Sequence, residues 1–209
     1  MDVWRTLIGR AVSRLEAAGL TPDDWRWGGG TVLALRHHHR HSRDIDIFLE
    51  DVQYLTRLSP RLANGHDDGL RAYAEAGNHV RLEYSGGEVD FLIVAPVFPE
   101  VASERRNVTE AGGSIQLLAD KEILGQKLYY RAAGFTGRDL YDFVAVTDNV
   151  PELLSDAGLL GIARMRADAL TAALASPACA VAYTHIDRPT KNVPFEQARQ
   201  KLLEWIERP

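Results

Sequence analysis

The sequence predicts an α+β protein, in which a short mixed sheet flanked by helices is followed by a helical C-terminal half. Strand-like runs, in which apolar and polar residues alternate, are confined to the first part of the chain. From Ala119 onward the apolar residues recur at helical spacing instead. We therefore expect an α/β core over residues 1–118, with a helical region over residues 119–209 packed on it.

The composition is that of a globular protein in a reducing compartment. The chain has 209 residues, of which 45% are hydrophobic and 25% charged, and its net charge of -5 neither indicates nor excludes a nucleic-acid partner. Cys179 is the single cysteine, so an intramolecular disulfide is excluded. The N-terminus has a charged helix pattern, and no apolar run is long enough to span a bilayer. We expect a cytoplasmic protein without membrane contact.

Periodicity and turn residues predict the individual elements. We expect helices over residues 3–18, 31–36, 51–62, 120–133, 138–147, 151–174 and 194–206. We expect strands over residues 25–27, 44–49, 79–84, 88–94, 108–109 and 114–118. Gly19 is expected to cap the first helix, and the glycine-bearing loop at residues 85–87 predicts a hairpin. Residues 70–76 are expected to form a short helix or an irregular segment.

Three aspartates are candidate metal ligands. Asp44 and Asp46 alternate with isoleucines, which predicts a strand with both carboxylates on one face. Asp90 lies in a later strand pattern between apolar residues, where a cation would compensate its charge. Because Mg²⁺ prefers carboxylate oxygens, we predict that Asp44, Asp46 and Asp90 hold Mg²⁺, with two ions in the site. The alternative is that Asp44 and Asp46 form the solvent face of an edge strand.

A run of glycines, Gly28 to Gly30, precedes the short helix pattern that begins at Thr31. Backbone N–H groups at a helix start have no partner within the helix and attract phosphate. We predict that Gly29, Gly30 and Thr31 bind the phosphates of a nucleotide. Taken alone, the glycines fit a flexible turn equally well.

The order of these features is apolar-Gly-Gly, a helix and loop of about a dozen residues, and then Asp-apolar-Asp-apolar. This order, in Gly29, Gly30, Asp44 and Asp46 with Asp90 as the later acid, resembles the nucleotidyltransferase superfamily of the DNA polymerase β type. The resemblance implies a polymerase-β-like core, an NTP substrate and transfer of a nucleoside monophosphate to an acceptor hydroxyl.

A second group of charged residues lies in KLYYRAAGFTGRDLYDF, residues 127–143. Together with the glycine and aspartate motif, it resembles the AbiEii and AbiGii-like toxin branch of the superfamily, which is related to the MenT toxins. The resemblance implies that Lys127 contacts the nucleotide phosphates, with Lys121 as the alternative that fits the pattern less well, and that Asp139 acts near the attacking group as a base. Arg138 is by its charge a natural partner for a triphosphate or for the nearby acids. Asp142 alone is better interpreted as an ion-pair partner that pins two helices.

A histidine cluster lies between arginines 36 and 43; it comprises His37, His38, His39 and His41. One reading is a zinc site, although consecutive histidines cannot all face one ion. Another is a basic stripe that contacts phosphates of the nucleotide or of RNA, in which Arg43 is the strongest candidate because it adjoins Asp44. The favoured reading is a solvated, mobile loop.

The sequence thus predicts a Mg²⁺-dependent nucleotidyltransferase. By resemblance it is a toxin of an abortive-infection or type IV toxin–antitoxin system, with tRNA as an acceptor and an antitoxin protein as a partner. One alternative is an antibiotic nucleotidyltransferase acting on an aminoglycoside or lincosamide. Another is a catalytically silent binding protein of the same fold.

Overall fold

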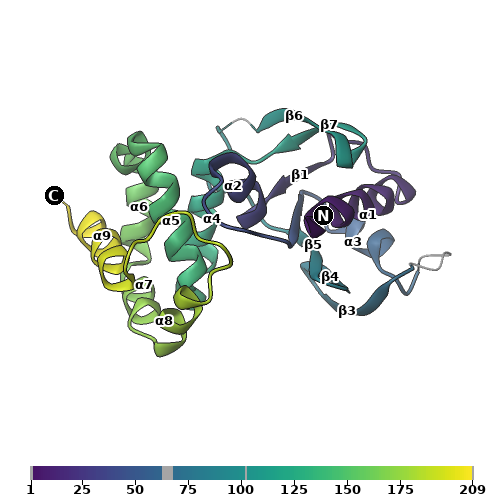
Figure 1. The fold of residues 1–209 in the computed structure, drawn as a ribbon. Helices are drawn as coiled ribbons and strands as arrows, with labels where there is room; N and C mark the ends of the chain where they lie inside the picture. The colour runs from purple at the N-terminus through teal and green to yellow at the C-terminus, as the bar shows by residue number, and fades with distance from the viewer. Residues whose placement is uncertain (1, 63–67, 102, 209) are drawn as a thin grey trace. The chain divides into compact units, whose positions relative to one another are not determined.

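A computed structural model describes residues 2–62, 68–101 and 103–208 of the chain. The chain divides into two compact units. We call the first, residues 1–32, 42–95 and 102–119, the sheet unit, and the second, residues 33–41, 96–101 and 120–209, the helical unit. Helix α2 (Gly29–His37) crosses the boundary between them (Figure 1).

The described strands form one mixed seven-stranded sheet in the order β3-β4-β5-β2-β1-β7-β6 (Figure 1). Its strands are β1 (Trp25–Gly28), β2 (Ile45–Leu49), β3 (Leu70–Ala76), β4 (His79–Tyr84), β5 (Gly87–Ile93), β6 (Glu104–Val108) and β7 (Gly113–Leu117). The pairs β2–β5 and β1–β7 are parallel, and the other neighbours are antiparallel. The predicted mixed sheet with flanking helices is confirmed.

Helix α1 (Val3–Ala17) packs on β2 and β5, and two further helical segments, α3 (Gln53–Leu58) and η1 (Thr109–Ala111), complete the unit. The alternation predicted for β2 is confirmed, because Ile45 and Ile47 are fully buried while Asp46 and Phe48 are partly exposed. Gly19 follows α1 with a φ of 81° and donates its N–H to the Glu16 carbonyl, as expected for a helix-ending glycine.

The expectation of a helix or irregular segment over residues 70–76 is wrong, because this segment is the edge strand β3. Its side chains are almost all exposed, so no apolar residue marks a buried face and the usual alternation is absent. β3 pairs antiparallel with β4 across the short turn at Gly77 and Asn78. A Gly-Asn pair between two runs is a hairpin signal, and it is the sequence feature that identifies this strand.

The helical unit confirms the predicted helical C-terminal half. Its helices are α4 (Asp120–Tyr130), α5 (Gly137–Asn149), α6 (Ala157–Met165), α7 (Ala167–Leu174), α8 (Pro177–Thr184) and α9 (Phe195–Glu207), with 3-10 turns η2 (Ala132–Gly134) and η3 (Pro151–Ser155).

The single helix expected over residues 151–174 is wrong. The Asp156 side chain accepts a hydrogen bond from the Leu159 N–H, which starts a new helix there. Helix α8, which begins with Ser176 as N-cap and Pro177, was not predicted.

Candidate active site

A row of polar positions crosses four neighbouring strands of the sheet. The strand registers pair Arg81 with Asp90, Asp90 with Asp46, and Asp46 with Gly28. Directly opposed residues on neighbouring strands project to the same side of a sheet. Because the alternate residue Ile45 is buried on the face that α1 covers, Asp46 and Asp90 share the opposite face. The sheet thus brings together two of the three predicted metal ligands.

The start of α2 lies against the Asp46 carboxylate. A Cβ atom at Gly29 would lie 1.9 Å from Asp46 Oδ2, and Gly29 has a φ of 70°. A Cβ at Gly28 would lie 2.6 Å from a Leu118 methyl carbon and 2.7 Å from the Phe48 ring. Gly29 therefore combines a left-handed backbone with no room for a side chain, whereas a Cβ at Gly28 would have to displace the ends of two side chains. The backbone at Gly29 approaches Asp46 where the open N–H groups of a helix start are found.

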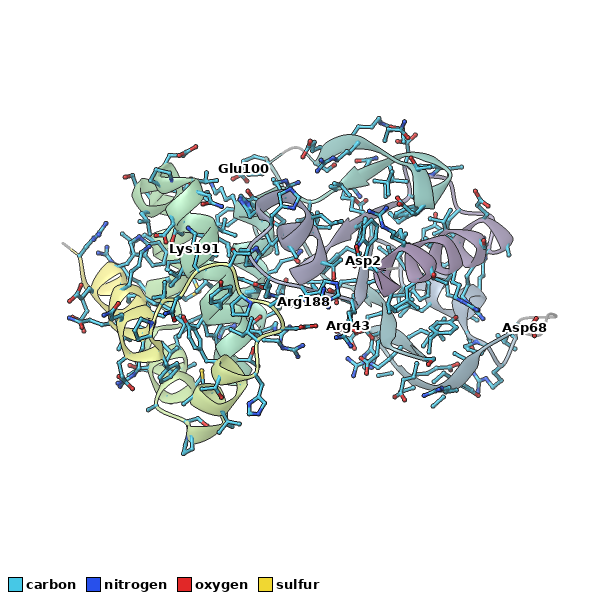
Figure 2. The ribbon with its side chains drawn as sticks, in the orientation of Figure 1. Asp2, Arg43, Asp68, Glu100, Arg188 and Lys191 are labelled. Carbon is cyan, nitrogen blue, oxygen red and sulfur yellow. The ribbon has the colours of Figure 1, made fainter. Side chains whose placement is uncertain are left out.

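Thr31 and Asp44 tie α2 to the beginning of β2. The Thr31 hydroxyl donates to the Asp44 carbonyl and shares a hydrogen bond of 2.8 Å with Ser42 Oγ. The Asp44 carboxylate accepts a hydrogen bond of 3.1 Å from the backbone N–H of Glu88, at the start of β5. Arg43 is exposed beside it (Figure 2). Asp44, two residues before Asp46, is therefore positioned by the hydrogen bond to its carbonyl and by the contact of its carboxylate with β5.

Asp90 is held by an arginine that the sequence analysis did not single out. Arg81 Nε lies 2.8 Å from Asp90 Oδ1 and Arg81 Nη2 lies 3.1 Å from Asp90 Oδ2, so the pair is bidentate. Glu88 Oε2 lies 3.4 Å from Arg81 Nε. Partial burial raises the pKa of Glu88, and the nearby charges of Asp44 and Asp90 raise it further against the opposing effect of Arg81. The acids of this face therefore repel one another.

The residues of this face fit a divalent cation such as Mg²⁺. Asp46 and Asp90 offer adjacent carboxylates and no nitrogen or sulfur ligand, and Mg²⁺ binds through one or two carboxylates together with substrate phosphates. No group of three or more His, Cys, Asp or Glu side chains arranged to hold a metal is found among the described residues. Of the three predicted ligands, Asp46 and Asp90 are directly paired on neighbouring strands, whereas the Asp44 carboxylate is engaged with the Glu88 N–H.

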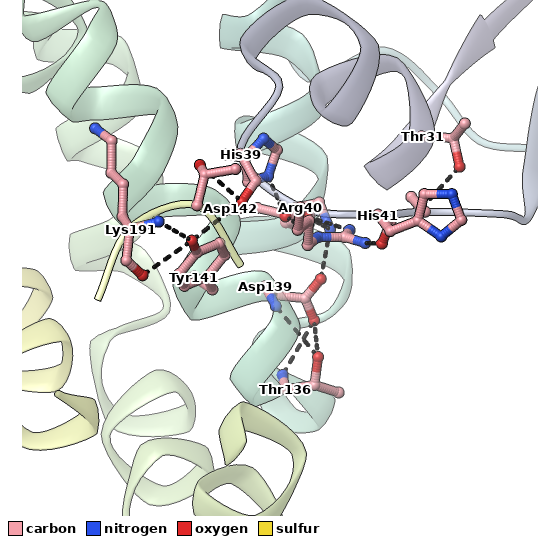
Figure 3. A network of polar contacts seen from close by, with 12 residues as sticks. Thr31, His39, Arg40, His41, Thr136, Asp139, Tyr141, Asp142 and Lys191 are labelled. Atoms are coloured by element: carbon pink, nitrogen blue, oxygen red, sulfur yellow. Dashed lines mark hydrogen bonds and ion pairs between the residues drawn. The ribbon is translucent and has the colours of Figure 1, made fainter. Parts of the chain in front are cut away.

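In the helical unit, Lys127 and Asp139 form a buried ion pair between α4 and α5. Asp139 also belongs to a capping box, in which its carboxylate accepts from the Thr136 N–H and hydroxyl (Figure 3). Burial alone would raise the pKa of Asp139, but Lys127 and Arg131 hold it below its usual value. Arg138, between the cap and Asp139, is exposed.

Asp142, one helical turn further along α5, is the most heavily paired carboxylate described in this unit. Arg40 contacts both of its oxygens, at 2.6 and 3.0 Å, and Lys127 Nζ lies 3.1 Å away. His39 Nε2 lies 2.8 Å from Asp142 Oδ1 (Figure 3). Burial would raise the pKa of Asp142, but Arg40 and Lys127 hold it well below its usual value. The interpretation of Asp142 as a residue that pins two helices is confirmed.

The favoured reading of the histidine cluster as a solvated, mobile loop is wrong. His39 is fully buried, and the His37 side chain is only 7% exposed. His37 pairs with Asp120, His39 with Asp142, and His41 with Asp187. These partners are three different carboxylates, so these three histidines are separate anchors, whereas His38 is exposed. The sequence did not predict the roles of His39 and Arg40, because their partner, Asp142, lies about a hundred residues away in the chain.

The chain resembles a known protein family and solved structures. The family model described as "Nucleotidyl transferase AbiEii toxin, Type IV TA system" matches residues 10–202. The chain belongs to the AbiEii family of nucleotidyltransferase toxins. The predicted family and enzyme class are therefore confirmed. No curated protein sequence matches the chain.

Two solved structures resemble the AbiEii-family fold of this chain. MenT4, a nucleotidyltransferase toxin from Mycobacterium tuberculosis H37Rv, has 14% sequence identity and a TM-score of 0.52, covering 98% of this chain and 85% of its own. An antigenic nucleotidyltransferase-like protein from Paracoccidioides brasiliensis has 15% identity and a TM-score of 0.50, covering 88% and 98%. These likenesses support the fold. Separately, no helix within the described residues has the length and apolar character to cross a membrane.

Proposed function

We propose that this AbiEii-family protein transfers a nucleoside monophosphate from an NTP to a hydroxyl of an RNA acceptor, with tRNA as the acceptor class. The acceptor hydroxyl gives its proton to water while its oxygen forms a bond to the α-phosphorus. The bond from that phosphorus to the β-phosphate oxygen breaks, and pyrophosphate leaves with the electron pair. The observation that carries the proposal is the pairing of Asp46 with Asp90 beside the Gly29 backbone, in a chain of a nucleotidyltransferase family.

Asp46 and Asp90 would hold Mg²⁺, and the Asp44 carboxylate would join them by releasing the Glu88 N–H that it contacts. When bound, the metal neutralises phosphate charge and favours ionisation of the attacking hydroxyl. Gly29, Gly30 and Thr31 would offer backbone N–H groups to the phosphates at the start of α2, while the Thr31 hydroxyl remains engaged with Asp44. We assign the same phosphate-attracting role to the exposed Arg43.

Lys127 and Asp139 serve the reaction as a coupled pair in this proposal. Lys127 would attract the nucleotide phosphates, with the exposed Arg138 supplying further positive charge. The Asp139 carboxylate accepts hydrogen bonds from Thr136 and Lys127, and its pKa is lowered. These contacts favour a positioning role for Asp139 through Lys127 over the role of a base, because a group with a lowered pKa is a weak proton acceptor.

Transfer of labelled nucleotide tests the proposal directly. The purified protein would be incubated with each α-labelled NTP and Mg²⁺, in separate reactions with total tRNA, ribosomal RNA, cell protein and a panel of aminoglycosides and lincosamides. We expect label in tRNA and at least a hundredfold loss of transfer for Asp46→Asn, on the scale of removing a transition-state stabiliser. Asp168→Asn, an exposed acid on α7, is the matched control and should transfer normally.

Each other outcome changes the proposal. Label in an aminoglycoside or lincosamide and none in RNA would make the protein an antibiotic nucleotidyltransferase. Transfer that survives Asp46→Asn would remove the assigned metal site. A folded protein that labels none of these acceptors would support a binding role instead.

The family description also supports a partner, since it places its members in a type IV toxin–antitoxin system. Expression of this chain should then arrest growth, and a cognate antitoxin encoded beside it should relieve the arrest. Growth curves for the unaltered chain and for Asp46→Asn test this, because an arrest that depends on nucleotide transfer disappears in the variant. Equal arrest by both would contradict the toxin mechanism.

A further inference from the structure

Arg81 is the residue of the polar row that the proposed reaction leaves without a role. It lies on β4 directly opposite Asp90 on β5, and the strand register places Asp46 on the far side of Asp90. The Arg81 side chain is 43% exposed, whereas that of Asp90 is 10% exposed. Arg81 is therefore free to move into solvent, while the carboxylate that it holds is confined between two strands.

The bidentate contact engages both oxygens of Asp90. Nε reaches Oδ1 at 2.8 Å and Nη2 reaches Oδ2 at 3.1 Å. Each Asp90 oxygen accepts one hydrogen bond from the guanidinium, so a cation that coordinates Asp90 shares the carboxylate with a positive charge and repels it. The same arginine lies 3.4 Å from Glu88, so it also offsets the repulsion between neighbouring acids.

Arg81 provides the charge that a metal would otherwise provide. Arg81 Nε lies within reach of two carboxylates, those of Asp90 and Glu88. The guanidinium thus carries a permanent positive charge among several carboxylates. A divalent ion carries twice that charge in a smaller volume, and it can therefore replace the arginine.

We propose that Arg81 is an internal counter-ion of the candidate metal site, which a divalent cation displaces from Asp90 when it binds to Asp46 and Asp90. The proposal rests on the metal assignment made in the proposed function. It predicts that Arg81 weakens binding of the free metal and keeps the acidic face neutralised in its absence. Arg81 is then a positioning and regulatory residue, since it acts on the metal through Asp90.

Mn²⁺ titration measures this competition without reference to catalysis. Binding of Mn²⁺ to the full chain would be followed by calorimetry and by the electron paramagnetic resonance of the free ion. We expect Arg81→Gln to lower the dissociation constant about two- to fivefold, the scale of one partly exposed ion pair. Arg71→Gln is the matched control, because Arg71 is an exposed arginine on the neighbouring strand β3 that contacts Ser85. It should bind Mn²⁺ like the unaltered protein.

Two further variants separate this inference from the assignment of the metal site. Asp90→Asn should weaken Mn²⁺ binding. In the double variant Asp90→Asn with Arg81→Gln, the loss of Arg81 should not raise the affinity for Mn²⁺. If Asp46→Asn and Asp90→Asn bind Mn²⁺ as the unaltered chain does, the metal assignment itself fails. If those two variants lose Mn²⁺ but Arg81→Gln binds it equally or more weakly, Arg81 supports Asp90 and the counter-ion role is overturned.

The unaltered protein gives a second readout that does not depend on how Arg81→Gln folds. The Nε–H of Arg81 should give a protected NMR signal in the metal-free protein, identified by its absence in Arg81→Gln or Arg81→Lys. Saturation with Mg²⁺ should shift this signal and increase its exchange with water. An Arg81 signal that is unchanged while Mg²⁺ occupies Asp46 and Asp90 would overturn the proposal.

Discussion

Two acids, one in each unit, have pKa values shifted in opposite directions. In the helical unit, Asp142 is fully buried, and Arg40 and Lys127 hold its pKa well below the usual value. In the sheet unit, partial burial and neighbouring acids raise the pKa of Glu88. Paired charges of the first kind stabilise a fold, whereas adjacent like charges of the second kind are tolerated where a cation binds. The comparison therefore separates structural acids from acids that are available for chemistry.

Removal of the Asp142 carboxylate should have the largest effect on stability. Asp142→Ala leaves Arg40 and Lys127 without their shared partner, and we expect a loss of about 3–5 kcal/mol in the free energy of unfolding, as for a broken buried ion pair. Urea denaturation at pH 7 measures it. Asp148→Ala on the same helix is the control: its partly exposed pairs with Lys191 and Lys201 should contribute about 0–1 kcal/mol.

The same comparison has a consequence at low pH. A lowered pKa in the folded state means that the unfolded chain takes up the proton first, so the stability from Asp142 is present above its ordinary value of 3.8 and is lost as the pH falls below it. Asp142→Asn should therefore show a shallower loss of stability with acid than the unaltered chain. If Asp142→Ala and Asp148→Ala lower the free energy of unfolding by the same amount, Asp142 is not a structural acid of the kind described.

A methyl group at Gly29 should have the next largest effect. Gly29→Ala combines a left-handed backbone with a Cβ placed 1.9 Å from Asp46 Oδ2, and we expect a loss of about 2–4 kcal/mol in unfolding free energy. Gly19→Ala is the matched control, since its φ is 81° but a Cβ there meets nothing within 4 Å. It should lose about 1–2 kcal/mol from the backbone alone.

The difference between these two glycine variants isolates the contact with Asp46. Mn²⁺ binding should also weaken in Gly29→Ala, because the carboxylate must move away from the new Cβ. If both variants lose the same stability and bind Mn²⁺ alike, the close approach of α2 to Asp46 is not maintained in solution.

Neutralisation of Glu88 should have the smallest effect and the opposite sign. Glu88→Gln removes one of the mutually repelling acids, and we expect an unfolding free energy that is unchanged or higher by less than about 1 kcal/mol at pH 7. A raised pKa in the folded state means that the charge on Glu88 opposes folding at neutral pH, so the gain should vanish below its ordinary value of 4.5, where Glu88 is protonated. A clear loss of stability at pH 7 would show that Glu88 acts as a paired, structural acid.

Local pattern is the reason that much of the sheet unit could be predicted. Alternation in β2 revealed Asp46, and the hairpin of β4 and β5 was visible from its glycine turn. Counting back from that turn also pairs Arg81 with Asp90, so this contact was within reach of sequence reasoning. The edge strand β3 buries no regular apolar face, so the turn at Gly77 and Asn78 was its one local signal, and apolar periodicity could not reveal it.

The anchors of the helical unit could not be found in the same way. The partners of His39 and Arg40 follow from tertiary packing, and the motif around Lys127 and Asp139 does not reveal which cations surround Asp142. A buried polar network of this kind has no period and no fixed spacing. Its members look like a solvated basic segment until the fold is known.

The discontinuous helical unit also sets an order of events during synthesis. His39 leaves the ribosome 103 residues before Asp142, which is a delay of about 5–20 s at usual rates of translation. His39 and Arg40 therefore lack their partner Asp142 until α5 has been made. Nascent chains arrested before and after α5 should differ sharply in proteolytic cleavage at these histidines and arginines. A fragment that begins at Asp120 should keep the Lys127–Asp142 pair but lack the contacts of Asp142 with His39 and Arg40.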